Sequence, residues 1–313
     1  MSKVSFVIPC YCSAMTIGNV VSEIQNKMKQ MEKYTYEIIL VNDSSPDDTY
    51  EVIRKICGEN QNIIGVGLAK NFGQHAALMA GYHFVTGDIV VCLDDDGQTP
   101  ANEVDKLLNK IEEGWDVVYA EYENKMHSGF RNFGSTVNKK MTESMLGKPK
   151  ELYISSYFAA KRFIVDEMIK YQNSYPYVIG LILRTTKNIC NVKVTHRERE
   201  IGQSGYSIKK LLALWINGFT SFSVKPLRLA TFSGVTVAFI GFLYAVWTII
   251  KRFINSAAPV GWSSTIAILL MLGGMILFVL GMIGEYIGRI YICLNNSPQY
   301  VVRELINSGI NVE

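Results

Sequence analysis

Residues 89–98 read Ile89-Val90-Val91-Cys92-Leu93-Asp94-Asp95-Asp96-Gly97-Gln98, an apolar run that ends in three consecutive carboxylates. Such a run predicts a strand that is buried on both faces, as in a parallel sheet. In open α/β sheets, ligands bind outside the carboxyl ends of the strands, which is where these carboxylates would lie. Asp94 and Asp96 alternate and can face one ion, and hard oxygen ligands suit Mg²⁺ or Mn²⁺. The alternative interpretation is a solvated acidic turn.

The chain before this stretch alternates strands and helices with short connections. Strands are predicted over 4–8, where Pro9 would end the strand, and over 36–41 and 63–68, with a helical pattern after each. This alternation is typical of a doubly wound, mostly parallel sheet of the Rossmann-like α/β class. Further along, residues 103–113, 129–146 and 164–171 have helical patterns, and residues 116–119 have the pattern of a strand.

Composition excludes some classes of function. The chain has 31 Lys and Arg against 28 Asp and Glu, so it lacks the basic field expected of a nucleic-acid-binding protein. Six scattered cysteines give no zinc-site spacing. Cys10 and Cys12 could form a metal or redox pair, or serve as small apolar filler in a reducing cytosol. The amino terminus does not resemble a signal peptide, so we expect most of the chain to stay in the cytosol.

The last third of the chain predicts a membrane anchor. Residues 229–250 and 263–284 are each 22 residues long and uncharged, and a helix of that length reaches about 33 Å, enough to cross the hydrocarbon core. Aromatic residues near the ends suit the membrane interface. Before them, residues 208–222 carry one apolar stripe, which favours a helix in the membrane interface over one that packs on the globular domain. A buried core hairpin is the alternative.

The charges that flank the two spans predict the topology. Lys209, Lys210, Lys225 and Arg228 precede the first span, and Arg289 and Arg303 follow the second. The positive-inside rule then places both termini in the cytosol. Lys251 and Arg252, at the opposite end of the first span, count against this topology unless their side chains snorkel to the membrane interface. We expect a cytosolic domain over 1–207, an interface helix and linker over 208–228, a two-helix hairpin over 229–290 and a cytosolic tail over 291–313.

Several motifs together resemble a known family. They are Pro9 and Tyr11, the Asn42-Asp43-Ser44-Ser45 turn, Asn71-x-Gly73 with Ala80-Gly81, Gly87-Asp88 and Asp94-x-Asp96-x-Gln98. Their order and spacing resemble family 2 glycosyltransferases of the GT-A fold. A narrower similarity, to polyprenyl-phosphate glycosyltransferases with two spans, is found at three places. They are Asp94-x-Asp96-x-Gln98, the run from His196 to Tyr206, and Gly284-Glu285-Tyr286-Ile287-Gly288-Arg289.

The resemblance implies roles for particular residues in binding the donor. Nucleotide contacts would come from Pro9, Tyr11, Asp43, Lys70, Gly73, Asp94 and Asp95, with Asp43 accepting from an N–H of the base. Asp94, Asp96 and Gln98 would hold Mg²⁺ or Mn²⁺, which neutralises charge on the leaving diphosphate. Arg199, Ser204 and His196 would contact the diphosphate. Three of these residues also have an interpretation that involves no ligand. Asp43 could cap a helix, Arg199 could form an exposed salt bridge, and His196 could be a packed ring.

The resemblance also implies the acceptor. Lys125, Arg131 and Ser135 match the segment that binds the phosphate of a polyprenyl lipid. The alternative interpretation is that this segment is the solvated basic face of a helix and binds no ligand. The implied reaction is direct displacement, with inversion, by an oxygen of undecaprenyl phosphate on a nucleotide sugar, a UDP-sugar by preference. A phosphate monoester is already ionised at neutral pH, since its second pKa is ~6, and so needs no strong general base.

Three positions depart from the family pattern. Some relatives have an Asp where this chain has Ser155-Ser156-Tyr157-Phe158, which a phosphate acceptor tolerates and a hydroxyl acceptor would not. Cys12 stands where Asn is common. Gly205 stands where some members have Lys, a departure that bears on how the diphosphate is bound.

These observations predict a multi-pass enzyme of the bacterial inner membrane with its catalytic domain in the cytosol. Transfer to a lipid or glycan hydroxyl is one alternative, and a non-catalytic membrane adaptor or flippase component is another. Glycines along the second span (Gly273, Gly274, Gly281 and Gly284) would allow the close helix packing of a homo-oligomer. Neither the sugar nor the base can be identified from the sequence.

Overall fold

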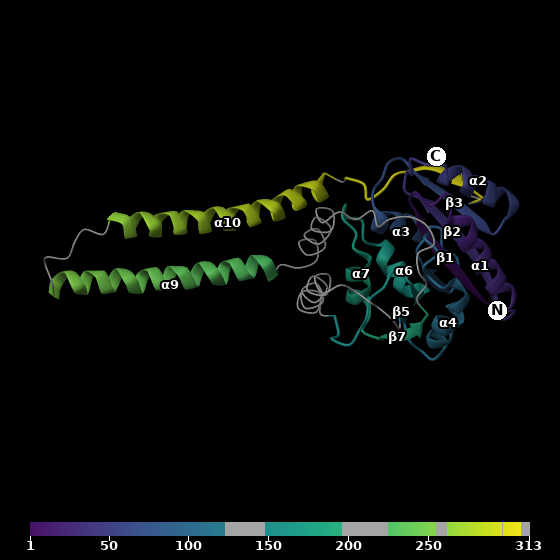
Figure 1. Ribbon diagram of the computed structural model, residues 1–313, viewed down its shortest axis with the longest axis horizontal. Helices are drawn as coiled ribbons and strands as arrows, with labels where there is room; N and C mark the ends of the chain where they lie inside the picture. The colour runs from purple at the N-terminus through teal and green to yellow at the C-terminus, as the bar shows by residue number, and fades with distance from the viewer. Residues whose placement is uncertain (123–147, 196–224, 255–261, 296, 308–313) are drawn as a thin grey trace. The chain divides into compact units, whose positions relative to one another are not determined.

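The computed structural model describes residues 1–122, 148–195, 225–254, 262–295 and 297–307 (Figure 1). The chain divides into two compact units. The first comprises residues 1–212 with 296–313, and the second comprises residues 213–295. The predicted helix over 129–146 and the apolar stripe over 208–222 lie outside the described residues.

The first unit is built on an eight-stranded sheet of order β7-β5-β6-β4-β1-β2-β3-β8. Its strands are β1 (Ser2–Cys10), β2 (Tyr34–Asn42), β3 (Ile63–Leu68), β4 (Ile89–Cys92), β5 (Val117–Tyr122), β6 (Phe158–Lys161), β7 (Ile189–Val194) and β8 (Val302–Ile306). Strands β1 to β4 run parallel to one another, whereas β6 is antiparallel to β4 and β5, and β8 is antiparallel to β3. The parallel centre confirms the predicted Rossmann-like α/β sheet.

Helices cover both faces of this sheet. One face carries α1 (Ile17–Lys29), α2 (Thr49–Glu59), the short η1 (Ala101–Glu103) and α4 (Val104–Glu112), whose apolar residues share one core with Val4, Phe6 and Ile8 of β1. The other carries α3 (Gln74–Tyr82), α6 (Arg162–Ile169) and α7 (Val178–Thr185), which contact one another. Successive side chains of the buried strands therefore pack into two cores, one on each face of the sheet, which is why the strand sequences are continuous apolar runs.

Gly81 sets how closely α3 approaches the sheet. A Cβ at this position would lie 2.6 Å from Cγ1 of Val7 and 2.9 Å from Cγ2 of Val41, on β1 and β2. No larger side chain fits there without displacing the helix. The Ala80-Gly81 motif therefore has a packing role.

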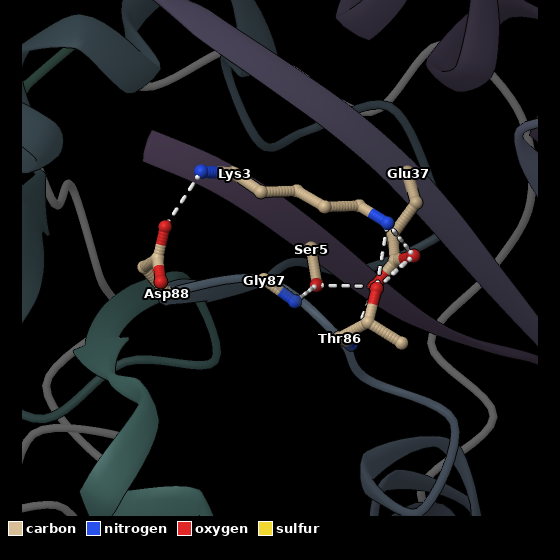
Figure 2. A network of polar contacts seen from close by, with 6 residues as sticks. All are labelled: Lys3, Ser5, Glu37, Thr86, Gly87 and Asp88. Carbon is tan, nitrogen blue, oxygen red and sulfur yellow. Dashed lines mark hydrogen bonds and ion pairs between the residues drawn. The ribbon is translucent and has the colours of Figure 1, made fainter. Parts of the chain in front are cut away.

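The Gly87-Asp88 motif also has a structural role, at the amino end of the sheet. Figure 2 shows the buried Glu37 carboxylate accepting hydrogen bonds from the Ser5 hydroxyl (2.6 Å) and from the amide and hydroxyl of Thr86 (2.7 Å each). The Lys3 ammonium lies 2.6 Å from the same carboxylate. Gly87 donates to the Ser5 hydroxyl, and Asp88 accepts from the backbone N–H of Lys3. This network joins the turn before β4 to β1 and β2.

The C-terminal segment, which the sequence suggested as a tail, includes strand β8. This strand pairs with the outer edge of β3 (Figure 1). The register shifts between Gly67 and Leu68 of β3. The strand includes the charged residues Arg303 and Glu304, and charged side chains are common on strands at a sheet edge. The chain therefore returns to the first unit after it has formed the second.

The second unit consists of α9 (Lys225–Ile254) and α10 (Trp262–Leu294), which contain the two predicted spans. Large apolar side chains on both helices are exposed, such as Phe232 (71%) and Leu277 (70%). Among the described residues, one stretch, Met271–Leu294, is long and apolar enough to cross a membrane, and a shorter apolar stretch occupies Ala230–Tyr244.

Candidate active site

The loops that follow β3, β2, β1 and β4 meet at the carboxyl edge of the sheet. The order of the strands places four groups of residues next to one another along this edge: Lys70–Gly73, then Asp43, then Tyr11, then Asp94–Asp96. The chain crosses to the other side of β1 when it forms β4, so β1 and β4 flank a topological switch point, the usual position of a ligand in such sheets. The predicted donor-binding residues thus lie on neighbouring loops.

Asp94 is held by two neutral donors. Its Oδ1 accepts from the Gln74 amide at 3.1 Å, and its Oδ2 accepts a short hydrogen bond from the Ser156 hydroxyl. The pKa of Asp94 is raised to about 6, first by burial and then by the charges of Asp96 and Asp95, against the lowering effect of the Ser156 hydrogen bond. The carboxylate therefore lies where negative charge is costly and a nearby cation would be stabilising.

Asp95 joins the loops after β4 and β1. Its Oδ2 accepts from the backbone N–H of Tyr11 at 3.0 Å. Burial raises the pKa of Asp95, although the Tyr11 hydrogen bond opposes the shift. The Tyr11 side chain itself is half exposed, at 50%, so its ring is open to a ligand at the switch point.

Asp96 and Gln98 follow in the same turn, where Asp96 Oδ1 accepts from the backbone N–H of Gln98 at 3.1 Å. Both residues are partly exposed, and they offer hard oxygen donors beside two carboxylates of raised pKa. Within the described ranges, no three His, Cys, Asp or Glu side chains come together as a complete ligand set. Mg²⁺ commonly takes only one or two protein carboxylates and completes its shell with water and substrate phosphates, so these residues fit such an ion.

Asp43, at the end of β2, holds the loop that leads into α3. Its two carboxylate oxygens accept from the backbone N–H groups of Phe72 (2.7 Å) and Gly73 (2.8 Å). Gly73 has a φ of 90°, a conformation that glycine adopts without strain. Burial raises the pKa of Asp43, while these two hydrogen bonds lower it. Helix α2 begins later, at Thr49, so Asp43 is not its cap.

Pro9 does not end its strand, contrary to the sequence-based expectation. Strand β1 continues to Cys10, and Pro9 pairs with Val41 of β2. Pairing of β1 with β4 stops at Val7, so Pro9 lies where β1 has a neighbour on one side only and a missing N–H is tolerated. Cys10 is buried and Cys12 is exposed with a φ of 56°, which argues against the alternative that they form a pair.

Six of the predicted site residues fall outside the described part of the chain. They are the acceptor set Lys125, Arg131 and Ser135 and the diphosphate set His196, Arg199 and Ser204. Lys70 is described: it is exposed, and its ammonium lies 5.0 Å from the centre of the Phe72 ring.

Three residues near Asp94 and Asp96 were not predicted as site residues. Gln74 belongs to the first turn of α3, Ser156 precedes the antiparallel strand β6, and Tyr122 ends β5. The pKa of Tyr122 is raised to about 12, mainly by burial and also by the charges of Asp94 and Asp96. Only the absence of an expected Asp marked residues 155–158 in the sequence, and no pattern showed that Ser156 would meet Asp94.

Comparison with known proteins gives a consistent result. Residues 5–169 match the model of Glycosyl transferase family 2, and residues 225–290 match that of the GtrB C-terminal hairpin. The undecaprenyl-phosphate 4-deoxy-4-formamido-L-arabinose transferase of Proteus mirabilis (strain HI4320) is 34% identical over 309 residues, which cover 98% of this chain and 94% of the relative. The protein of that name from Photorhabdus laumondii is 33% identical over 312 residues, covering 99% and 96%.

Solved structures share the fold of the first unit. Glucosyl-3-phosphoglycerate synthase from Mycobacterium tuberculosis, in complex with Mn²⁺, UDP and phosphoglyceric acid, superposes with a TM-score of 0.53 at 22% identity over 69% of this chain and 75% of that one. Mannosyl-3-phosphoglycerate synthase from Rubrobacter xylanophilus gives a TM-score of 0.56 at 17% identity over 69% and 71%.

Proposed function

Because this chain belongs to glycosyl transferase family 2, we propose that it is a membrane-bound transferase that moves one sugar from a nucleotide sugar to undecaprenyl phosphate. One observation carries the proposal. Relatives named as undecaprenyl-phosphate sugar transferases match 98% or more of the chain, so the similarity includes both the acidic segment and the C-terminal helices.

The arrangement of the carboxyl edge supports a nucleotide sugar as donor. Asp43, Tyr11 and the loop with Lys70 and Gly73 would receive the nucleoside, on the β1–β3 side. The diphosphate would then lie toward Asp94–Asp96, after β4. Uracil is the base we favour, since a structural neighbour carries UDP with Mn²⁺ in a fold of the same kind.

Asp96 and Gln98, with Asp94 beside them, would hold a divalent cation, either Mg²⁺ or Mn²⁺. When bound, such an ion supplies Lewis-acid stabilisation of charge on the leaving diphosphate. Asp95 fixes the loop after β1 through the Tyr11 amide, and Gln74 and Ser156 fix Asp94. These hydrogen bonds set the places of the carboxylates before any ligand binds, which is the preorganisation that charge stabilisation needs.

The reaction we infer is a single displacement. A phosphate oxygen of the lipid forms a bond to the anomeric carbon, while the bond from that carbon to the diphosphate oxygen breaks and its electron pair leaves with the nucleoside diphosphate. The attacking phosphate is already charged at neutral pH, because its second pKa is ~6. Ser156 is compatible with this scheme, since a hydroxyl in place of a carboxylate is tolerable when no proton must be removed from the acceptor.

The connectivity supports an even number of membrane crossings. The chain leaves the first unit before α9 and returns to it as β8, which pairs with β3 of the same sheet. A sheet cannot be completed across a bilayer, so any crossing made by α9 must be reversed by α10. We therefore propose a two-span anchor at the bacterial inner membrane, with the catalytic unit and both termini cytosolic, as the match to a C-terminal hairpin also suggests.

The acceptor and diphosphate groups are proposed on the resemblance to the family alone. Lys125, Arg131 and Ser135 would grip the lipid phosphate, and Arg199, Ser204 and His196 would contact the diphosphate. Arginine suits these tasks because its planar guanidinium presents several donors to phosphate oxygens.

A transfer assay tests this function. The purified protein in detergent, supplied with Mn²⁺ and a panel of UDP-, GDP- and dTDP-sugars, should transfer sugar to undecaprenyl phosphate but not to undecaprenol. Asp96→Ala should abolish transfer while the protein stays folded and membrane-bound, and Asp105→Ala, at a partly exposed residue of α4 whose carboxylate pairs with Lys27, should retain it. Equal transfer to the alcohol would favour a hydroxyl-specific enzyme. Binding of no nucleotide sugar would favour a non-catalytic adaptor or flippase component.

A further inference from the structure

The segment Ser297–Asn307 is fastened to the first unit along its whole length. At its start, the Ser297 carbonyl accepts from the Ser174 hydroxyl at 2.7 Å, and the Gln299 amide donates to the Tyr171 carbonyl at 2.5 Å. Tyr300 then meets His83, with 2.8 Å between the hydroxyl and Nδ1. The segment thus begins at the loop after α6 and passes the end of α3 before it pairs with β3.

The far end of the segment is held by α2 and the turn after it. Arg54 donates to both carboxylate oxygens of Glu304, at 2.7 and 2.8 Å. The Asn307 amide lies within hydrogen-bonding distance of three carbonyls, those of Cys57 (2.6 Å), Asn60 (3.2 Å) and Ile63 (3.1 Å). Between these ends, β8 covers the edge of β3.

One contact of this segment falls on the candidate donor loop. The Val301 carbonyl accepts from the backbone N–H of Ala69 at 2.9 Å, directly before Lys70. The other end of the same loop is held by Asp43 through Phe72 and Gly73. Loop 69–73 is therefore fixed at both ends, with the exposed Lys70 and Asn71 between the two fixed points. The shift in register between Gly67 and Leu68, next to Ala69, aligns β8 with this contact.

We propose that the segment 297–307 positions loop 69–73 for nucleotide binding, so that docking of the C-terminal strand sets the affinity for a nucleoside diphosphate. Val301, Glu304 and Asn307 are then positioning residues, which act through the loop and not on the substrate. The nucleotide part of this inference rests on the proposed function. In the sequence, the segment follows α10.

The test removes contacts at the C-terminal end of the segment. The double variant Glu304→Ala/Asn307→Gly removes the Arg54 ion pair and the three amide contacts, and glycine keeps the positive φ of 59° at position 307. Arg303→Ala is the matched control, since Arg303 is the exposed extra residue of β8 at the register shift. Both full-length proteins are compared with wild type in detergent for hydrogen exchange over residues 64–73 and for the Kd of UDP with Mn²⁺.

We expect the double variant to exchange faster over 64–73 and to bind UDP about fivefold more weakly, the factor that a loss of about 1 kcal/mol gives. The KM for the donor should rise by a similar factor with kcat within about twofold, while Arg303→Ala matches wild type. Faster exchange over 297–307 with unchanged exchange over 64–73 and unchanged Kd would overturn the proposal.

Two further measurements keep the result decisive. If the double variant leaves the segment docked, Gln299→Ala and Tyr300→Phe are added to it in the full-length chain, which removes the contacts with Tyr171 and His83. Faster exchange over 297–307 in this variant without faster exchange over 64–73 would also overturn the inference. A wild-type protein that binds no nucleoside diphosphate would contradict the proposed function instead, and hydrogen exchange would still decide whether the segment positions the loop.

Discussion

The hydroxyl of Ser156 donates a hydrogen bond to Oδ2 of Asp94, across 62 residues of sequence. The contact exists because β6 runs antiparallel to β4, so the residues before β6 lie beside those after β4. A position that departs from the family pattern is thus in direct contact with the acidic cluster.

Ser156→Ala should slow transfer about tenfold. Asp94 keeps Gln74 as a donor but loses the hydrogen bond from Ser156 to its carboxylate, and a hydrogen bond to a charged group contributes at least about 1.5 kcal/mol. Ser156→Asp should be more harmful, since another carboxylate would lie against Asp94. Steady-state kcat/KM across a Mn²⁺ titration measures both effects. Ser155→Ala, which removes hydroxyl contacts to the carbonyls of Ala120 and Tyr157 but none to Asp94, is the control. A Ser156→Asp enzyme as active as wild type would contradict this role.

Asp43→Asn should weaken donor binding. Asparagine keeps one acceptor oxygen, so either the Phe72 or the Gly73 N–H loses its partner, at about 1–3 kcal/mol for a buried donor. The KM for the nucleotide sugar should rise at least tenfold and the melting temperature should fall. Asp48→Asn, at an exposed position of the same turn, serves as the comparison. If both variants bind the donor equally well, Asp43 does not order the loop.

Glu37 should stabilise the fold in a pH-dependent way. Burial opposes its ionisation, but hydrogen bonds from Lys3, Ser5 and Thr86 outweigh burial and hold its pKa below the ordinary 4.5. The stabilisation is therefore fully present above that ordinary value and is lost as pH falls through the lowered one. Glu37→Gln should cost about 2 kcal/mol at pH 7 and progressively less below pH ~4, as measured by denaturant unfolding. A destabilisation that does not change with pH would argue against the ion pair.

Gly81→Ala should destabilise the first unit by about 1–3 kcal/mol, because the new methyl group would overlap Val7 and Val41. Gly58→Ala is the matched control: no atom lies within 4 Å of a Cβ there, in helix α2. That change should leave stability unaltered or raise it by up to about 1 kcal/mol. Thermal unfolding of the two variants side by side gives the answer.

The sequence predicted the parallel centre of the sheet well, and for a physical reason. Strands buried on both faces are continuous apolar runs, so 63–68 was predicted to the residue, and 4–8 and 36–41 fall within β1 and β2. The antiparallel strands β6 and β8 were missed, because Phe158–Lys161 is short and Val302–Ile306 has two adjacent charged residues instead of the alternation typical of a half-buried strand. Their strand conformation depends on partners far away in the chain, which local pattern does not show.

The candidate site was predictable to a similar extent. The carboxylates of residues 94–96 and Asp43 follow strands directly, so the rule for carboxyl ends of parallel strands located them. Gln74 and Ser156 reach Asp94 only through the packing of α3 and the reversed direction of β6. No motif encodes that contact, and it had to be found in three dimensions.

The late position of β8 in the chain has a consequence for biosynthesis. The contact between Asn307 and Ile63 spans 244 residues, so the outer edge of β3 stays unpaired until β8 has been synthesised. An open strand edge invites pairing with other chains, which makes an unfinished polypeptide prone to aggregation. A chain whose synthesis stops before residue 302 would keep this edge open and would be a substrate for cellular proteases.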